Sequence, residues 1–316
     1  MTDLITIGET MAVFTPKISG PLRYIHDYTT CCAGAESNTA IGLQKLGHTT
    51  KWFSRIGNDE LGQYVLNTIR AEGVDTSAVI KDDNHSTGLM IKEFRTPNDT
   101  NVYYYRNNSA ASHMNPNDLT DELICDAKIL HLTGITPILS SSCMELTKKS
   151  IEIAKNNNVK ISFDPNIRLK LWGNKDYIPL IMDILMTSNI VMLGLSEAEH
   201  LFKTNQIDRI IEMLFQSDTI EYIAIKNGDK GAHIATRYET IYIPPFPCTC
   251  VDPIGAGDAF NAGFLAGILE GRDLQSCGNI AGIVGALATQ TTGDIEGLPT
   301  MEEVLAYIEN KPKTNR

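Results

Sequence analysis

The sequence has few of the features that mark a membrane protein, a secreted protein or a nucleic-acid-binding protein. No apolar run approaches the length of a membrane span, and the start, Met1-Thr2-Asp3, does not resemble a signal peptide. Acidic residues exceed basic ones, and the net charge of −11 argues against nucleic acid or an anionic membrane as a partner. An anionic substrate would therefore have to be met by locally placed Arg or Lys.

The cysteines lack the spacing of a metal site or a disulfide framework. Seven are present, an odd number, with Cys31 next to Cys32 and one residue between Cys248 and Cys250. Because no C-x-x-C pair exists, we expect no zinc site. Reduced thiols are typical of a cytoplasmic protein, and this is the location that we expect.

Two familiar nucleotide-binding motifs are incomplete. Residues 57–62 have the glycine spacing of a P-loop, but Gln63 stands where that motif requires Lys. Residues 255–257, Gly-Ala-Gly, could open a dinucleotide fingerprint, but Phe260 replaces its third Gly. The segment also lies near the C-terminus rather than after the first strand. These departures disfavour a P-loop NTPase and a Rossmann dehydrogenase.

What is present is a regular alternation of strand and helix patterns over 316 residues, enough for one large α/β domain. Apolar runs predict buried strands at residues 4–7, 128–132, 159–163, 189–193 and 222–226. Helical patterns occupy residues 36–46, 143–155, 177–186 and 207–215. Such alternation predicts a parallel sheet covered on both faces, with the functional site at the carboxyl ends of the strands.

Two stretches, residues 10–32 and 86–107, break this alternation. Residues 20–30 lack helical periodicity, and residues 87–94 and 101–105 form a hairpin pattern around Thr96-Pro97-Asn98-Asp99. We interpret these stretches as a small β-layer that projects from the main sheet as a lid over the substrate. The alternative is a surface hairpin with no such role. A protruding β-layer is also a natural pairing surface, so we expect a homo-oligomer.

The most informative segment is residues 251–258, Val-Asp-Pro-Ile-Gly-Ala-Gly-Asp, which runs into an apolar helix. Gly255, Ala256 and Gly257 are small enough to expose their backbone N–H groups at the helix N-terminus, a ready anion site. Asp258 lies in the same turn, where a carboxylate would repel a bound phosphate. Its expected function is to take a proton from the group that attacks the phosphate. The alternative is an ordinary Gly-rich loop with Asp258 as a helix-start residue.

Segments far apart in the chain together resemble the ribokinase-like (PfkB-type) family of carbohydrate kinases. The family's N-terminal signature is similar to residues 33–38 and 55–62, its nucleotide-phosphate loop to residues 226–231, and its C-terminal signature to residues 252–258. This resemblance covers nearly the whole chain. It implies one kinase domain of residues 1–316, with a three-layer α/β/α fold, a mostly parallel central sheet and a small β-sheet lid. It also implies the use of ATP and Mg²⁺.

Within that family the chain is most similar to the 2-keto-3-deoxygluconate kinases, over residues 103–110, 131–137, 164–172 and 293–297. The resemblance implies a sugar site formed by Gly34, Asn38, Tyr104, Arg106, Arg168 and Asp294. Two arginines suit a sugar acid, because each guanidinium can hold a carboxylate with paired, charge-assisted bonds. For either arginine alone, surface ion pairing is the alternative interpretation.

The resemblance also assigns a nucleotide site and a metal site. Nucleotide binding falls to Asn166, Ser196, Lys226, Gly228, Gly231, Gly255, Gly257 and Asn279. The metal falls to Glu199, although the family's Asn-x-x-Glu is here Ser196-x-x-Glu199. Met90 stands where some relatives have a sugar-facing Tyr. Pro253 replaces a Thr near the monovalent-cation site of ribokinases, which leaves open whether a monovalent cation is a cofactor.

These observations predict a sugar kinase that uses ATP to phosphorylate the 6-hydroxyl of 2-keto-3-deoxy-D-gluconate, with small molecules as its substrates. Asp258 would take the hydroxyl proton, and the N–H groups of residues 255–257 would hold the charge on the transferring phosphoryl group. Two alternatives stay open. One is a kinase of the same fold that acts on fructose or another sugar, and the other is a sugar- or nucleotide-binding regulator that lacks catalysis.

Overall fold

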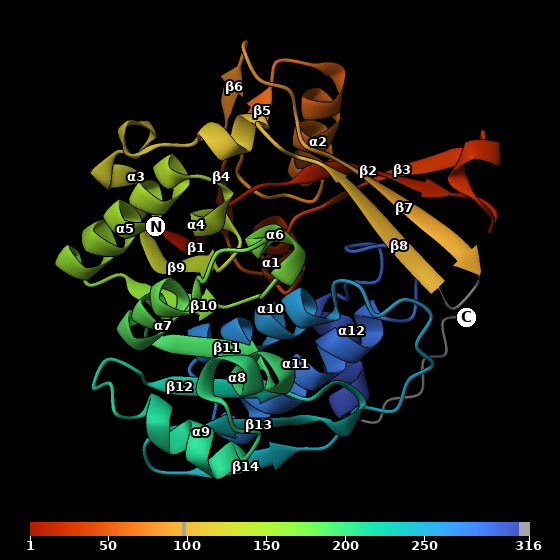
Figure 1. The fold of residues 1–316 in the computed structure, drawn as a ribbon. Helices are drawn as coiled ribbons and strands as arrows, with labels where there is room; N and C mark the ends of the chain where they lie inside the picture. The colour runs from red at the N-terminus through yellow and green to blue at the C-terminus, as the bar shows by residue number, and fades with distance from the viewer. Residues whose placement is uncertain (97–98, 310–316) are drawn as a thin grey trace.

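The large central sheet is mostly parallel (Figure 1). The computed structural model describes residues 1–96 and 99–309, and within them this sheet has the strand order β14-β13-β12-β11-β10-β9-β1-β4. Neighbouring strands are parallel except that β13 is antiparallel to both β12 and β14. The strands are β1 (Thr2–Ile7), β4 (Thr50–Phe53), β9 (Ala127–Thr133), β10 (Lys160–Asp164), β11 (Ile190–Gly194), β12 (Tyr222–Lys226), β13 (Ala232–Ala235) and β14 (Thr240–Ile243).

Helices cover both faces of this sheet, because successive strand side chains point to opposite faces and both faces are apolar. In β1, Leu4 belongs to one core, whereas Ile5 and Ile7 belong to the other. The core with Leu4 includes residues of α1 (Ala35–Lys45), α2 (Glu60–Ala71), α10 (Ala256–Leu269), α11 (Leu274–Ala288) and α12 (Met301–Ile308). The core with Ile5 includes residues of α3 (Asp121–Cys125), α4 (Thr136–Leu139), α5 (Ser141–Asn156), α6 (Leu169–Trp172), α7 (Ile178–Thr187), α8 (Leu195–Phe202) and α9 (Ile207–Leu214). The expected three-layer α/β/α fold is confirmed.

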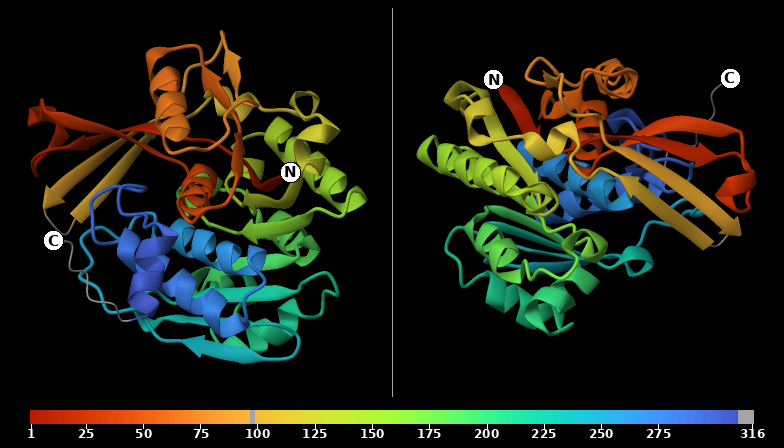
Figure 2. Two further views of the ribbon diagram at one scale, coloured as in Figure 1. Left: turned by 180° about the vertical axis from the view of Figure 1, so that it is seen from behind. Right: turned by 45° about the horizontal axis from the view of Figure 1, so that its top comes forward.

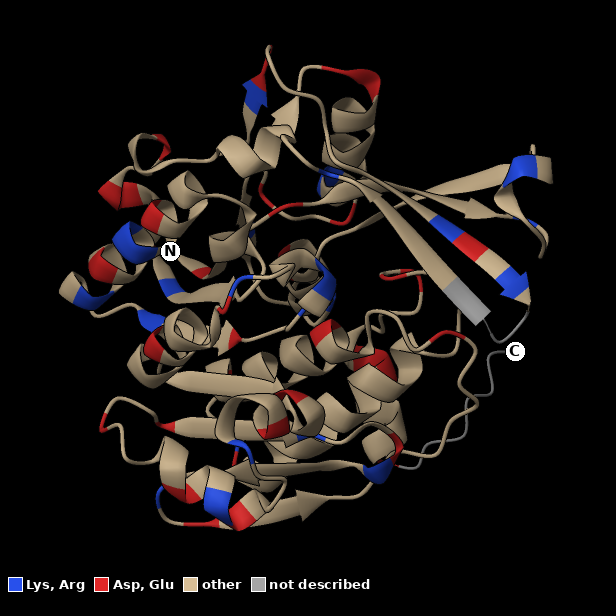
Figure 3. Ribbon diagram, in the orientation of Figure 1, with Lys and Arg blue, Asp and Glu red and all other residues tan. Residues whose placement is uncertain are grey.

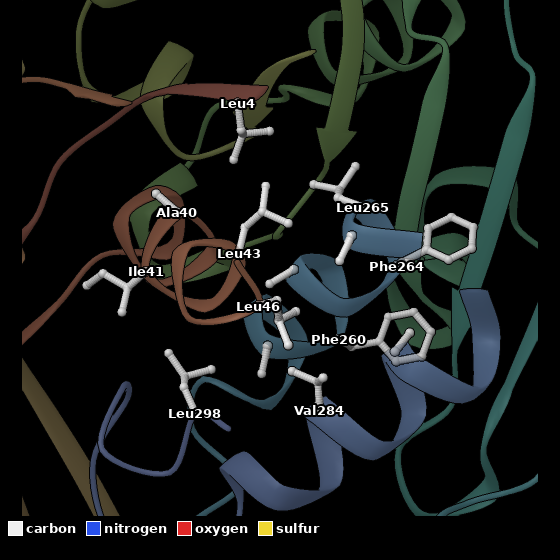
Figure 4. Packing of buried hydrophobic residues seen from close by; sticks show 14 of the residues in the cluster. Leu4, Ala40, Ile41, Leu43, Leu46, Phe260, Phe264, Leu265, Val284 and Leu298 are labelled. Atoms are coloured by element: carbon white, nitrogen blue, oxygen red, sulfur yellow. The ribbon is translucent and has the colours of Figure 1, made fainter. Parts of the chain in front are cut away.

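Small residues allow α10 to lie close to its neighbours. A Cβ atom on Gly42 of α1 would lie 2.8 Å from Ala262 of α10, and one on Gly263 of α10 would lie 2.8 Å from Ala281 of α11. Side chains of all three helices meet in the same core (Figure 4). Because α1 and α11 both pack closely against α10, they fix the position of its N-terminus relative to the sheet.

A second, four-stranded sheet projects from the main body (Figures 1 and 2). Its order is β3-β2-β7-β8, with β2 (Met11–Pro16), β3 (Tyr28–Ala33), β7 (Leu89–Thr96) and β8 (Asp99–Tyr105). These strands lie in the two stretches predicted for the β-layer, residues 10–32 and 86–107, except that β3 extends to Ala33. Strands β7 and β8 pair antiparallel, as the hairpin pattern predicts, although Pro97 and Asn98 of the predicted turn lie outside the described residues. Strand β2 pairs parallel with β7.

The predicted strands and helices of the main body are confirmed to within two residues at each end. The antiparallel strands β13 and β14 were not predicted, because each has four residues, too few for a clear period. Two short strands, β5 (Arg55–Gly57) and β6 (Ile80–Asp82), pair in parallel. The structure also has four short 3₁₀ helices, η1 (Leu22–Tyr24), η2 (Ala110–His113), η3 (Pro116–Asp118) and η4 (Gly228–Lys230). No helix in the described part of the chain has the length and apolar character to cross a membrane.

Candidate active site

A cavity of about 1640 Å³ lies between the small sheet and the carboxyl ends of the main-sheet strands. Its lining includes Met11 and Met90 from the small sheet, and Asp164, Gly194 and Lys226 from the ends of β10, β11 and β12. Open α/β sheets bind their ligands at this edge, so the cavity lies where the alternation of elements predicts the functional site.

The N-terminus of α10 forms one wall of this cavity. Its N-cap residue, Gly255, has a left-handed backbone with φ of 80°. A Cβ atom there would lie 2.5 Å from the carbonyl oxygen of Asp294, so the turn requires glycine. A Cβ atom on Gly257 would meet only the Lys226 ammonium, at 3.6 Å, so the space in front of Gly257 is open.

The first turn of α10 presents unpaired donors to this open space. The first intrahelical bond runs from the N–H of Ala259 to the carbonyl of Gly255, at 2.9 Å. The N–H groups of Gly257 and Asp258 come before that bond, so an anion can accept hydrogen bonds from them. The N–H of Ala256 instead lies 3.4 Å from the Pro253 carbonyl, which makes it the weakest candidate of the donors expected from the sequence.

Asp258 has the electrostatic character of a proton acceptor that works near neutral pH. Burial raises its pKa to about 7, and repulsion from Asp164 and Asp294 adds to the rise. The amide of Asn38 opposes the rise by donating to Asp258 Oδ2 at 2.9 Å. A carboxylate that is close to half-ionised at neutral pH is well matched to general-base catalysis.

A buried ion pair lies beside the N-terminus of α10. The Lys226 ammonium donates to Asp164 Oδ2 at 2.8 Å and to Asn261 Oδ1 at 3.0 Å. Burial alone would lower the pKa of Lys226, but attraction from Asp164 and nearby acids raises it. Burial alone would raise the pKa of Asp164, yet Lys226 and Asn261 hold it below its usual range. Both groups therefore keep their charges, and Lys226 offers a fixed cation next to Gly257.

All six residues expected at the sugar site line the cavity. They are Gly34, Asn38, Tyr104, Arg106, Arg168 and Asp294. They come from the start of α1, from β8 and its end, from the loop after β10 and from the loop before α12, so the fold brings together segments that are far apart in the sequence.

The two arginines differ in their surroundings. Arg106 forms an ion pair with Glu9, a buried residue after β1 that also accepts a hydrogen bond from Ser109 at 2.5 Å. Its guanidinium lies 5.9 Å from the centre of the Tyr104 ring. Arg168, by contrast, is exposed and forms no ion pair within the residues that the structure describes. Arg106 is thus already partly neutralised, whereas Arg168 keeps its charge for a ligand.

Several charged residues of the cavity were not expected at the site from the sequence, among them Glu9, Lys92 and Glu197. Lys92 is 1% exposed, and its ammonium lies 3.4 Å from Asp294 Oδ1. The sequence held one signal for it. Lys92 follows Met90 by two residues in a predicted strand, so the two side chains share a face, and a lysine on an apolar face requires a partner.

Most of the residues expected at the nucleotide site also line the cavity. Asn166, Ser196, Lys226, Gly228, Gly231, Gly255 and Gly257 line it. Asn279 does not, since its side chain accepts a hydrogen bond from Gln275 at 3.0 Å and the lining from α11 begins three residues later, at Gly282. Part of the cavity wall is apolar and suits a planar base better than phosphates. It is formed by Ile243, Pro244, Pro245 and Phe246.

The structure shifts the candidate metal residue by two positions. Glu199 is exposed and outside the cavity lining, whereas Glu197 is in the lining. Glu197 is residue N3 of α8, and its oxygens accept the N–H groups of Gly194 and Ile167, each at 2.6 Å. Glu197 therefore caps the start of α8 from within the cavity, and the expected metal role of Glu199 in Ser196-x-x-Glu199 stays a prediction.

Glu197 and Asp164 together fit a hydrated Mg²⁺ ion. Burial raises the pKa of Glu197, and repulsion from Asp164 adds to the rise, so a nearby dication would favour its charged form. The carboxylate oxygens of both residues already accept hydrogen bonds. Mg²⁺ commonly keeps several waters and binds one or two carboxylates together with substrate phosphates, which suits contact through water here. Among the described side chains, no group of three or more His, Cys, Asp or Glu forms a ready-made metal cage.

Comparison with known proteins places this geometry in context. The profile of the pfkB family carbohydrate kinase matches residues 1–301. The chain is 35% identical over 309 residues to a 2-dehydro-3-deoxygluconokinase of Bacillus subtilis (strain 168), which covers 97% of this chain and 95% of that protein. A PfkB protein from Polaromonas sp. JS666 has a similar structure, with a TM-score of 0.88 at 31% identity over 97% of this chain and 100% of the other. An Escherichia coli protein described as ribokinase II, in complex with ATP and Mg²⁺, gives a TM-score of 0.90 at 25% identity over 98% and 100% of the two chains.

Proposed function

Because this chain belongs to the pfkB family of carbohydrate kinases, and is therefore a sugar kinase, we propose that it transfers the γ-phosphoryl group of ATP to the 6-hydroxyl of 2-keto-3-deoxy-D-gluconate. The relative from Bacillus subtilis is named for this substrate, also called 2-dehydro-3-deoxygluconate. The observation that carries the proposal is the charge of Arg168. Glu9 and Asp294 already pair with Arg106 and Lys92. Arg168 and Lys170 line the cavity without an ion pair among the described residues, and Arg168 is the one of the two that belongs to the expected sugar site, where it can hold a sugar carboxylate.

Asp258 is the proposed general base. Its carboxylate lies in the cavity between the sugar-site residues and the N-terminus of α10, so it can accept the proton of a hydroxyl that attacks a phosphate held by that helix. Asn38 orients the carboxylate by donating to Oδ2, which leaves Oδ1 for the hydroxyl. Gly34 and Tyr104 would position the rest of the sugar.

The transferring phosphoryl group would be stabilised by donors and charges that are in place before the reaction. The N–H groups of Gly257 and Asp258 would donate hydrogen bonds to the phosphoryl oxygens, and the Lys226 ammonium beside them would offset the negative charge. Mg²⁺, when bound to the nucleotide phosphates, supplies further neutralisation, with Glu197 and Asp164 as the acids on that side of the cavity. The small sheet would exclude water, which would otherwise receive the phosphoryl group.

A coupled assay of ADP release, with one sugar at a time, tests the proposal. We expect rapid turnover with 2-keto-3-deoxygluconate, and the panel also contains its galactonate epimer, fructose and ribose. Asp258→Asn serves as the inactive control for contaminating kinases. A higher specificity constant for fructose or ribose than for either sugar acid would overturn the substrate assignment and leave the kinase assignment intact.

One observation favours a neutral sugar as the second candidate. Arg106 already has Glu9 as a counter-ion, so one of the two arginines expected to bind a carboxylate is partly neutralised. Glu9 could also accept a hydrogen bond from a sugar hydroxyl, because it lines the cavity. The same panel separates the two candidates.

A further inference from the structure

One buried cation lies on the inner face of the small sheet. Met90 and Lys92 are two residues apart on β7, so they point to the same face, and both line the cavity. Met90 belongs to an apolar cluster with Met11 and Ala33. A lysine that is 1% exposed beside such a cluster is costly to bury unless a counter-charge reaches it.

The counter-charge comes from the main body and leads to the proposed base. The Lys92 ammonium lies 3.4 Å from Asp294 Oδ1. The other oxygen of Asp294 accepts a hydrogen bond from Asn38 Nδ2 at 3.3 Å, and the same nitrogen donates to Asp258 Oδ2 at 2.9 Å. Lys92, Asp294 and Asn38 are buried and Asp258 is half-buried, so the interactions in this series of contacts are poorly screened.

We propose that Lys92 is a positioning residue for phosphoryl transfer, which holds Asp294 against Asn38 and offsets the charge that Asp294 presents to Asp258. The inference rests on the proposed role of Asp258 as the base. The small sheet is then part of the catalytic apparatus, because Lys92 reaches Asp294 only when β7 lies over the cavity.

The electrostatic consequence of removing Lys92 has a definite direction. Burial raises the pKa of Asp294, and Lys92 opposes that rise. Asp294 in turn raises the pKa of Asp258. Without Lys92, Asp294 loses its counter-charge, so the pair of carboxylates Asp294 and Asp258 keeps a proton to higher pH. The other charged or titratable groups that face these residues are Asp164, Lys226, Asp252, Cys31 and Cys32, and none of them changes in the variants below.

The test is the pH profile of kcat/KM for Lys92→Met. We expect the acid limb to move up by about one pH unit, which lowers kcat/KM about fivefold at pH 7 and less than about twofold at pH 9. Lys92→Arg keeps the charge and should follow the parent profile. Arg95→Met removes an exposed cation from the same strand and is the matched control for the overall charge of the small sheet. An equal loss at both pH values would mean a purely structural role and overturn the proposal.

A second background tests whether the effect passes through Asp294. The double variant Asp294→Asn with Lys92→Met should have the acid limb of kcat/KM at the same pH as the single variant Asp294→Asn. A shift of the same size in both backgrounds would refute the pathway through Asp294.

The pH dependence of urea unfolding gives a readout that needs no substrate. The pH range over which Asp258 takes up its proton should extend about one unit higher in Lys92→Met, and Asp258→Asn should abolish that difference. If no sugar acid is phosphorylated but this shift is found, the substrate proposal fails and the inference about Lys92 stands. If the shift is absent, the inference fails whatever the substrate.

Discussion

At the scale of single residues, Asp258 combines a raised pKa, a fixed donor and a position at the N-terminus of α10. Asp258→Asn keeps the size of the side chain and removes its ability to take a proton. Turnover should fall roughly 100-fold or more while ATP affinity stays close to that of the parent. Steady-state kinetics and nucleotide titration check this, with Asp183→Asn on the exposed face of α7 as a matched control. Turnover within a few-fold of the parent would contradict the assignment.

The same residue links stability to pH. The pKa of Asp258 is about 7 in the folded protein, against roughly 4 for an aspartate in an unfolded chain. Between these values the folded state binds the extra proton, so this group makes the free energy of unfolding fall as pH rises, until the folded-state pKa is passed. Asp258→Asn should therefore gain stability relative to the parent from pH 5 to pH 7, by about 2 kcal/mol, and gain no more above pH 8. Urea unfolding across this range measures the gap, and a gap that does not change with pH would show that Asp258 titrates normally.

The two arginines should respond differently to truncation. Arg168→Ala removes an exposed cation, so it should raise KM for the sugar acid about tenfold, change KM for ATP little and leave the melting temperature unchanged. Arg106→Ala should also raise KM, but it leaves Glu9 buried without its counter-ion and should lower the melting temperature. Arg209→Ala on α9, far along the chain from both and exposed, is the control. Equal effects on both substrates would instead place the arginines at the nucleotide phosphates.

At the scale of elements, two glycines at the N-terminus of α10 have different roles. The fold requires Gly255, whereas Gly257 keeps the anion space open. Gly255→Ala places a side chain at φ of 80°, 2.5 Å from the Asp294 carbonyl oxygen, so it should destabilise the protein by about 2 kcal/mol or more. Gly257→Ala meets only the Lys226 ammonium at 3.6 Å, so the fold should keep its stability while turnover falls about tenfold or more, because the methyl group occupies the anion space. Urea unfolding and kcat, measured on both variants, decide this. Loss of stability in Gly257→Ala with normal turnover in Gly255→Ala would reverse the assignment.

The elements of the main body could be predicted because their signals are local. Buried strands are continuous apolar runs, and their helices follow with a clear period, so the parallel sheet and its site edge follow from general rules. The glycine turn before Asp258 could be predicted for the same reason, since its chemistry lies within one turn of chain.

Other features depend on neighbours that no local pattern reveals. The pairing of β2 with β7 joins strands more than 70 residues apart, and the ion pair of Glu9 with Arg106 joins residues 97 positions apart. Which glutamate of α8 lines the cavity depends on the phase of the helix. Residues 197 and 199 of α8 are about 200° apart around its axis, so a shift of two positions exchanges a side chain in the cavity for one in solvent. Asn279 likewise lies on α11, a helix that contributes to the cavity, but outside the part of α11 that lines it.

At the scale of the whole molecule, a net charge of −11 opposes the approach of the two proposed substrates, ATP and a sugar acid, which are both anions. Acidic and basic residues are spread over the main body and the small sheet (Figure 3). The cations of the cavity are mostly held in pairs, Lys226 with Asp164, Lys92 with Asp294 and Arg106 with Glu9. Such an arrangement produces little attraction at long range, so capture must depend on donors that act at contact distance.

Salt dependence tests this last point, since exposed charges are screened beyond about 8 Å at 0.15 M salt while close contacts inside a closed cavity are screened much less. Raising the ionic strength from low to physiological values should leave the specificity constant for 2-keto-3-deoxygluconate unchanged or raise it, because the long-range field of the protein is repulsive. Fructose has no carboxylate and should be a poor substrate at every salt concentration. The measurement is kcat/KM for both sugars across a salt series at fixed free Mg²⁺. A steep fall with salt for the sugar acid would mean that long-range attraction steers it to the cavity, and efficient phosphorylation of fructose would show that the charge of Arg168 does not select the substrate.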